Sequence, residues 1–138
     1  MDRGKCLNEM EFLLEKKVSK ETNKGIITVG FTRKGNKHLY NDILGRAKVL
    51  QIEDLINLHV SLENSTFIDS VKLVQKRKDD ITKFYYFKDN DKDLYYNVAE
   101  VVNKGKVHRY LYSITNILTH IVNKQNLNEK TTSNHLGS

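Results

Sequence analysis

The sequence contains no proline, no tryptophan and only one cysteine, Cys6. A lone cysteine cannot close a disulfide within the chain or form a Cys-x-x-Cys site, so the fold must be stabilised by packing. Without proline, the turns must depend on glycine and asparagine. No apolar run reaches the roughly 20 residues that a membrane-spanning helix needs, and we therefore expect a soluble protein.

The 138 residues suffice for one compact domain but not for two ordinary ones. We expect a single domain over residues 1–123 and a flexible polar tail over residues 124–138. The 23 Lys and Arg residues outnumber the 17 Asp and Glu residues, which gives a net charge of +6. This excess favours a polyanionic partner such as nucleic acid.

The spacing of apolar residues indicates the main elements. In the first half it predicts helices over residues 7–18 and 51–63, and a strand over residues 26–31. In the second half it predicts strands over residues 66–74, 81–88, 94–102 and 107–115, with turns at residues 89–92 and 103–105. The result is an α+β fold in which N-terminal helices pack on one face of an antiparallel meander.

Gly35 and Asn36 predict the start of a further short helix. Gly35 interrupts the preceding strand pattern, and Asn36 can cap a helix that begins with Lys37 and His38. The N–H groups at a helix start favour anions, and an imidazole titrates near neutral pH. His38 therefore suits proton transfer at a phosphodiester, although a surface histidine at a helix start is the commoner case.

The open face of the predicted sheet offers a second group of candidates. Strand alternation places Arg109, Ser113 and Thr115 on one face, whereas Tyr110 and Ile114 fall on the face expected to join the core. A guanidinium can bridge two phosphate oxygens, so this polar stripe could hold a phosphate. The alternative is an ordinary solvated strand face.

Basic and aromatic residues accompany these candidates. Lys76, Arg77 and Lys78 form a compact cluster before the strand that contains Lys83, and such groups contact backbone phosphates. Neighbouring tyrosines could stack bases wherever they are exposed. These tyrosines are Tyr85, Tyr86, Tyr95 and Tyr96.

Three segments together resemble a known group of nucleases. They are KHLYNDILGRAKVLQIEDL, RKDDITKFYYFKD, and NVAE followed by HRYLYSIT. Over residues 36–115 the chain resembles the phage- and polymorphic-toxin-associated nuclease domains grouped with the barnase, EndoU, colicin and RelE ribonucleases. The resemblance implies a helical front packed on an antiparallel sheet, and metal-independent cleavage of RNA.

The resemblance also implies roles for particular residues. The family's basic and histidine position falls on Lys37 and His38, and its last-strand positions fall on Arg109, Ser113 and Thr115. In the implied transesterification, one group removes the 2′-proton, the 2′-oxygen attacks phosphorus, and a second group protonates the 5′-oxygen, leaving a 2′,3′-cyclic phosphate. His38 is then the acid or the base and Arg109 the clamp on the transition state.

Several assignments stay open within this interpretation. The second proton carrier is Lys37, Tyr40 or a neighbouring tyrosine, and Arg77 and Lys83 serve either catalysis or binding. The expected RNA contacts are Lys76, Arg77, Lys78, Lys83 and Tyr40.

The expected partners are RNA, including tRNA, and an acidic immunity or antitoxin protein, with no membrane and no metal or nucleotide cofactor. The expected place of action is the cytoplasm, reached by delivery as part of a larger toxin or phage protein. The alternatives are a non-catalytic nucleic-acid-binding domain and a structural or interaction module of a phage.

Overall fold

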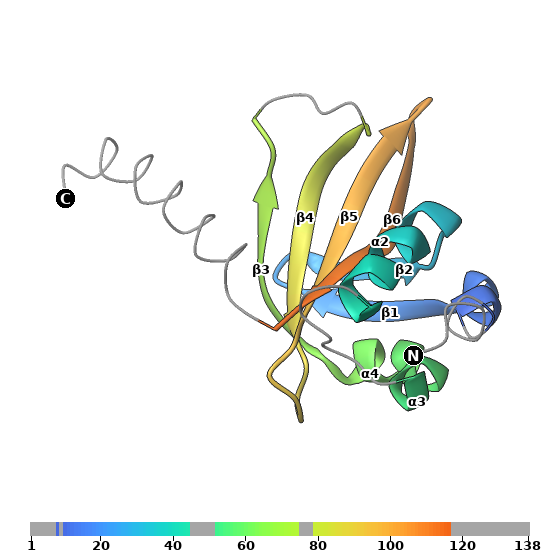
Figure 1. Cartoon of the computed structure of the whole chain (residues 1–138). Coiled ribbons are helices and arrows are strands. Elements are labelled where there is room, and N and C mark those ends of the chain that lie inside the picture. Colours follow the sequence, from blue (N-terminus) through green and yellow to red (C-terminus); the bar gives the residue numbers. More distant parts are fainter. Residues whose placement is uncertain (1–7, 9, 45–51, 75–78, 117–138) are drawn as a thin grey trace.

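The computed structural model describes residues 8, 10–44, 52–74 and 79–116 and has an α+β fold built on one six-stranded sheet (Figure 1). The strands are β1 (Lys17–Thr22), β2 (Gly25–Gly30), β3 (Thr66–Lys72), β4 (Ile81–Lys88), β5 (Tyr95–Asn103) and β6 (Lys106–Thr115). The helices are the 3₁₀ helix η1 (Phe12–Glu15) and the α-helices α2 (Arg33–Leu44), α3 (Ile52–Ile56) and α4 (Leu58–Asn64).

The strand order is β1-β2-β6-β5-β4-β3. Strands β3 to β6 form the antiparallel meander that the sequence predicts. The β1–β2 hairpin joins this meander through a parallel pairing of β2 with β6, at Gly30 and Tyr110. The sheet is therefore mixed, and the three α-helices lie between β2 and β3 in the chain, so that among the described helices only η1 precedes all the strands. The expectation of N-terminal helices on a purely antiparallel sheet is wrong in these two respects.

The sheet curls so that β1 and β2 run across the other strands (Figure 1). Strands β1 and β3, the two edges, come into contact with each other. The main core fills the inside of the curl and takes side chains from the helices and from most strands. It includes Met10, Leu13, Val29, Leu39, Leu55, Leu58, Leu62, Phe87, Val98 and Leu111.

The expected helix over residues 7–18 ends early. Its last described turn is η1, and the chain continues as β1, a strand that the sequence analysis does not predict. In β1 the side chains of Val18 and Lys20 are buried and their neighbours are exposed. Because one of its two buried residues is a lysine, β1 does not show the alternation of apolar and polar residues that predicts a strand.

Helix α2 begins earlier than predicted. Thr32 caps it, because its hydroxyl oxygen accepts the backbone N–H of Gly35 at 3.0 Å. Asn36 is not the cap: it lies inside the helix, is buried, and donates from Nδ2 to the carbonyl of Met10 at 3.0 Å. His38 is consequently the sixth residue of the helix and not its first.

Gly35 lets α2 approach the sheet closely. A Cβ atom at this position would lie 2.4 Å from the carbonyl oxygen of Leu111 in β6, which is far inside van der Waals contact. The sequence pattern presents Gly35 as a helix breaker, but Gly35 lies inside α2 and is required for the packing of α2 against β6.

The other predicted elements agree closely with the structure. Strand β4 has the predicted bounds, β5 is shifted by one residue at both ends, and β6 begins one residue earlier than predicted. Positive φ at Lys104 and Gly105 forms the predicted tight turn. The predicted helix over residues 51–63 is present but is divided at Asn57 into α3 and α4.

Two predicted features lie outside the described residues: the basic cluster Lys76, Arg77 and Lys78, and the polar tail over residues 124–138. In the part of the chain that the structure describes, no helix is long and apolar enough to cross a membrane.

Candidate functional site

A β-bulge in β6 determines which side chains share a face. Asn97 of β5 pairs with Ser113, but the next residue, Val98, pairs with Leu111, so Tyr112 is an extra residue. Arg109 lies on the face of Leu111, and Ser113 lies on the opposite face. The polar stripe predicted from strict alternation is therefore wrong, because the bulge reverses the alternation between its members.

Ser113 and Thr115 have other surroundings. The Ser113 side chain is buried and its Oγ accepts a hydrogen bond from Nδ2 of Asn97 at 2.7 Å. Thr115 pairs with Tyr95 on the same face as Ser113. Neither hydroxyl is brought together with Arg109.

Arg109 instead ends a row of charged side chains that crosses three neighbouring strands. Lys83 of β4 pairs with Glu100 of β5, and Glu100 pairs with Arg109 of β6. The Nε of Arg109 and the hydroxyl of Tyr85 both donate to Oε1 of Glu100, each at 2.8 Å. The ammonium of Lys83 lies 4.8 Å from the centre of the Tyr85 ring. We call Lys83, Glu100, Arg109 and Tyr85 the charged row.

A pocket of about 330 Å³ opens over the charged row. Its other wall is the β1–β2 hairpin, from Thr22 to Ile27, which contributes Lys24. The side chain of Arg109 is 27% exposed and that of Glu100 is 14% exposed, so both are reachable from solvent without being fully hydrated. Three cations and one carboxylate line the pocket, which gives it an excess of positive charge.

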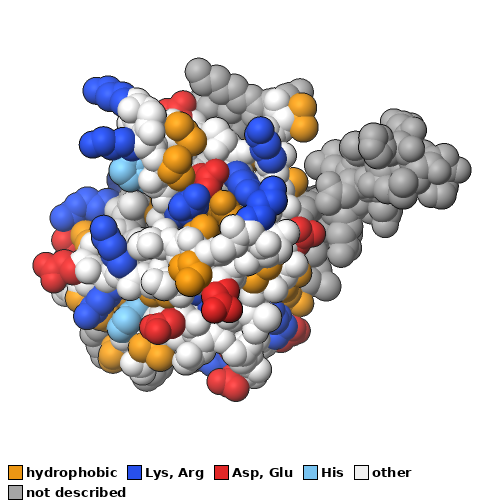
Figure 2. Space-filling model, turned by 180° about the vertical axis from the view of Figure 1, so that it is seen from behind, with side chains coloured by type: hydrophobic (Ala, Val, Ile, Leu, Met, Phe, Trp, Pro, Cys, Tyr) orange, Lys and Arg blue, Asp and Glu red, His pale blue; other side chains and the backbone are white. Residues whose placement is uncertain are grey.

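An excess of positive charge is also visible on the molecular surface. Seen from behind, Lys and Arg side chains gather on the upper half of the molecule, around hydrophobic ones (Figure 2). That half contains the β5–β6 turn and the adjoining ends of the central strands (Figure 1). The surroundings of the charged row therefore favour an anion.

The electrostatics of the charged row keep its donors protonated. Burial, and then the hydrogen bond to Glu100, raise the pKa of the Tyr85 hydroxyl. Burial alone would lower the pKa of Arg109, but its interactions with Tyr85 and Glu100 outweigh burial and raise it. Tyr85 and Arg109 thus remain hydrogen-bond donors to Glu100 across the physiological pH range.

The candidates on α2 lie elsewhere. His38 packs against Tyr112, with ring centroids 4.1 Å apart, and Tyr112 belongs to a smaller aromatic cluster outside the main core. Lys37 is exposed, and Tyr40 packs against the main core. None of the three lines the pocket at Arg109. As the sixth residue of α2, His38 also lies beyond the helix start that was expected to favour an anion beside it.

The tyrosines do not form an exposed stacking surface. Tyr85, Tyr86 and Tyr96 are buried, and only Tyr95 is half-buried. Base stacking was expected only for exposed rings, so the burial of these three removes them as candidates and leaves Tyr95.

Glu100 and the role of Tyr85 were missed by reasoning from the sequence, although a signal was present. A tight turn at residues 103–105 pairs Asn103 with Lys106, and counting back along both strands pairs Glu100 with Arg109. Opposite charges at a cross-strand pair are a recognisable pattern. Alternation describes one strand at a time and therefore does not show a partner on the neighbouring strand.

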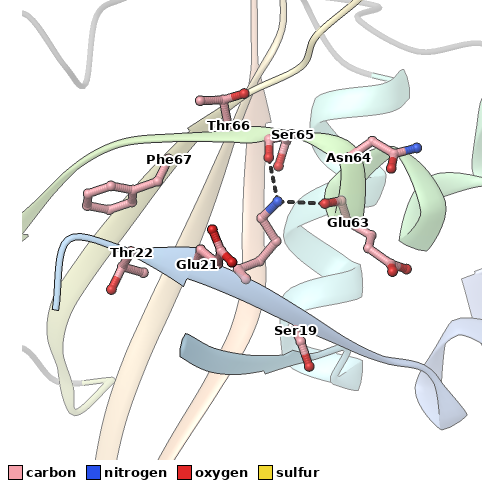
Figure 3. A pocket seen from close by; sticks show the side chains of 9 residues that line it. Ser19, Glu21, Thr22, Glu63, Asn64, Ser65, Thr66 and Phe67 are labelled. Atoms are coloured by element: carbon pink, nitrogen blue, oxygen red, sulfur yellow. Dashed lines mark hydrogen bonds between the residues drawn. The ribbon is translucent and has the colours of Figure 1, made fainter. Parts of the chain in front are cut away.

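A second, larger cavity of about 610 Å³ lies between the edge strands β1 and β3 (Figure 3). Lys20 reaches across it and donates to the carbonyl oxygens of Glu63 and Ser65. Its ammonium also lies 5.3 Å from the centre of the Phe87 ring. Burial lowers the pKa of Lys20, and the nearby Glu63 and Glu21 partly oppose this. Because main-chain acceptors hold the ammonium, we assign Lys20 to structure.

Comparison of the chain with models of protein families finds no match, and comparisons with curated proteins and with solved structures find none either. Across residues 8–116, apart from the segments left undescribed, no three His, Cys, Asp or Glu side chains cluster as a metal site would require. The charged row and its pocket are therefore the features that point to a function.

Proposed function

We propose that the chain is an endoribonuclease that cleaves RNA by acid–base transesterification, without a metal ion, to a 2′,3′-cyclic phosphate. The observation that carries the proposal is the charged row, in which one carboxylate stands between two cations at the floor of a basic pocket. A carboxylate can take a proton from a hydroxyl, and flanking cations can bind the phosphate on which that hydroxyl acts.

Glu100 is the general base in this mechanism. Tyr85 and Arg109 both bind its Oε1, which fixes the carboxylate and leaves Oε2 directed at no other described group. Oε2 accepts the 2′-proton, and the 2′-oxygen attacks phosphorus. Arg109 uses its remaining N–H groups on the non-bridging phosphate oxygens, where negative charge increases in the transition state.

Lys83 is the general acid. In-line displacement requires the acid on the side of phosphorus opposite the base, and Tyr85 is unsuited because its hydroxyl already donates to Glu100. Lys83 flanks Glu100 on the strand opposite Arg109. Its ammonium gives a proton to the departing 5′-oxygen and regains one from solvent, and Glu100 releases the 2′-proton to solvent. The sequence left the role of Lys83 open between catalysis and binding, and we propose catalysis.

The decisive experiment compares Glu100→Gln with Glu21→Gln. Glutamine keeps the size of Glu100 and can still accept a hydrogen bond, but it cannot take a proton. We expect wild-type protein in EDTA to cut RNA to 2′,3′-cyclic ends, and Glu100→Gln to slow the cutting by about 10²-fold or more. Glu21 is exposed on β1 and makes the matched control, which should cut at the wild-type rate.

Three outcomes would contradict the proposal. Folded wild-type protein that leaves several classes of RNA intact, tRNA included, would refute the activity. Tight RNA binding without cleavage would instead indicate a non-catalytic binding domain. Cleavage that survives Glu100→Gln but is lost in His38→Ala would place the catalytic centre on α2, as the sequence resemblance implies. Circular dichroism of each variant verifies that the fold is retained.

The proposed biological setting is that of a toxin domain acting on RNA in the cytoplasm of a target cell. It is supported by the net charge of +6 and by the basic pocket, which an acidic immunity or antitoxin protein would complement. Expression of the chain in bacteria should be toxic, and coexpression of the product of a neighbouring gene should relieve the toxicity. Equal growth with wild-type protein and with Glu100→Gln would contradict this setting.

A further inference from the structure

The face that carries the charged row continues beyond it toward the β5–β6 turn. Glu100 pairs with Arg109, Val101 with His108, and Val102 with Val107, without a bulge in between. Side chains two residues apart on a strand share a face, so Val102 and Val107 lie beside Glu100 and Arg109, about 7 Å along the strands. We call Val102 and Val107 the valine shelf.

The valine shelf is unusually open for a pair of branched apolar residues in register. Val102 is 46% exposed and Val107 is 48% exposed. Lys104 is exposed and follows it in the turn, so Arg109 and Lys104 supply basic groups at the two ends of the shelf. An apolar surface between two basic positions complements a ligand in which an apolar plate alternates with negative charges.

We propose that the valine shelf binds one unpaired nucleobase of the RNA strand whose phosphate lies at the charged row. This inference rests on the proposed function and adds a substrate class to it. A phosphate held by Arg109 places its nucleoside along the strands, and the flat face of the base packs on the methyl groups of Val102 and Val107. The adjoining phosphate then lies near Lys104.

The chemistry of the valine shelf also determines its selectivity. Valine side chains offer no hydrogen bonds, so the shelf accepts any of the four bases through their flat faces. Bases within a duplex are stacked on their neighbours and cannot reach it. The preferred substrate is therefore single-stranded RNA, with little base preference at this position.

A binding experiment with the unmodified protein tests the inference. The probes are fluorescein-labelled 2′-O-methyl RNA oligonucleotides, which lack the attacking hydroxyl: one single strand of mixed bases, one strand of the same length with an abasic backbone, and one duplex. Fluorescence anisotropy gives the affinities. We expect the base-bearing single strand to bind about fivefold more tightly than the abasic strand or the duplex, from apolar burial of one base.

The variant Val102→Thr with Val107→Thr should remove this preference while leaving the affinity for the abasic strand unchanged. Threonine keeps the branched shape suited to a strand and replaces one methyl group by a hydroxyl. Val60→Thr is the matched control, since Val60 is 42% exposed on α4, and it should bind like wild type. Should the double variant misfold, Val102→Ala alone takes its place.

The outcomes separate this inference from the proposed function. Equal affinity of wild-type protein for base-bearing and abasic strands, or a preference retained in the valine variants, overturns the valine shelf. Cleavage that depends on Glu100 would still stand in that case. Wild-type protein that binds none of the three probes and cuts no RNA overturns both.

Discussion

Glu100 illustrates what single residues contribute to this molecule and how much of that can be read from the sequence. Arg109 and Lys83 can be selected as phosphate ligands from their charge and their places in predicted strands. Glu100 gains its meaning only from its two neighbours across the strands. His38 is chemically apt for catalysis, but its ring packs on Tyr112, away from the pocket. The type of a residue predicts which chemistry its side chain can perform, whereas the pairing of strands decides which side chains lie together.

Asp89 carries a prediction at the same scale. Its Oδ1 accepts the N–H groups of Asp91 and Lys92 at 2.8 Å, and its Oδ2 accepts the hydroxyl of Tyr96. Burial would raise the pKa of Asp89, but these hydrogen bonds outweigh burial and lower it. The carboxylate therefore stabilises the fold above the ordinary pKa of about 3.9, and this contribution is lost as the pH falls through the lower, folded-state value.

Asp89→Asn should lower the free energy of unfolding at pH 7 by about 1.5 to 3 kcal/mol, the range for a hydrogen bond to a charged group. The difference from wild type should shrink as the pH falls from 5 toward 2. Urea denaturation across this range measures both quantities. Asp91→Asn, at an exposed position in the same loop, should change little. If the difference in unfolding free energy between Asp89→Asn and wild type grows on acidification, the pKa of Asp89 is not lowered in the folded state.

At the scale of elements, the predicted strands were largely correct where turn chemistry and apolar content agree. The tight turn at Lys104 and Gly105 fixes the register of β5 with β6, and β4 is rich in aromatic residues. The sequence pattern failed at β1, whose inner face holds Lys20, and at the bulge in β6. A bulge shifts a strand by one residue and leaves no mark in composition, so alternation beyond Leu111 could not be predicted.

Helix α2 shows the same limit and provides a test. In an exposed helix, glycine to alanine stabilises by up to about 1 kcal/mol. At Gly35 the added Cβ would lie 2.4 Å from the carbonyl oxygen of Leu111, so we expect Gly35→Ala to destabilise by about 1 to 3 kcal/mol instead. Thermal or urea unfolding shows whether Gly35→Ala raises or lowers the stability. Asn41→Ala, at an exposed position of α2, is the control and should be neutral or stabilising.

At the scale of the whole molecule, the curl of the sheet could not be predicted from the sequence. The meander followed from consecutive strands and short turns, but the parallel pairing of β2 with β6 joins segments far apart in the chain. The curl brings β1 over the meander, and it places Lys24 in the wall opposite Arg109. The candidate site thus depends on the least predictable feature of the fold.

Lys20 stabilises the curl of the sheet, and a substitution can test this role. It joins β1 to the carbonyls at the end of α4 and the start of β3. Lys20→Ala removes the donor and leaves two carbonyl oxygens without it, so the free energy of unfolding should fall by about 1 to 3 kcal/mol. Lys17→Ala, exposed on the same strand, should stay within about 0.5 kcal/mol of wild type. Equal stability of Lys20→Ala and Lys17→Ala would contradict the structural role assigned to Lys20.

The approach of β1 to β3 has a consequence for association between molecules. The outermost strands of an open sheet expose unpaired N–H and C=O groups, onto which a strand from another copy can add. Here the two outermost strands contact each other, and Lys20 spans the gap between them. A foreign strand would have to displace a buried ammonium before pairing with either edge. The curl that shapes the pocket thereby also guards the chain against edge-to-edge aggregation.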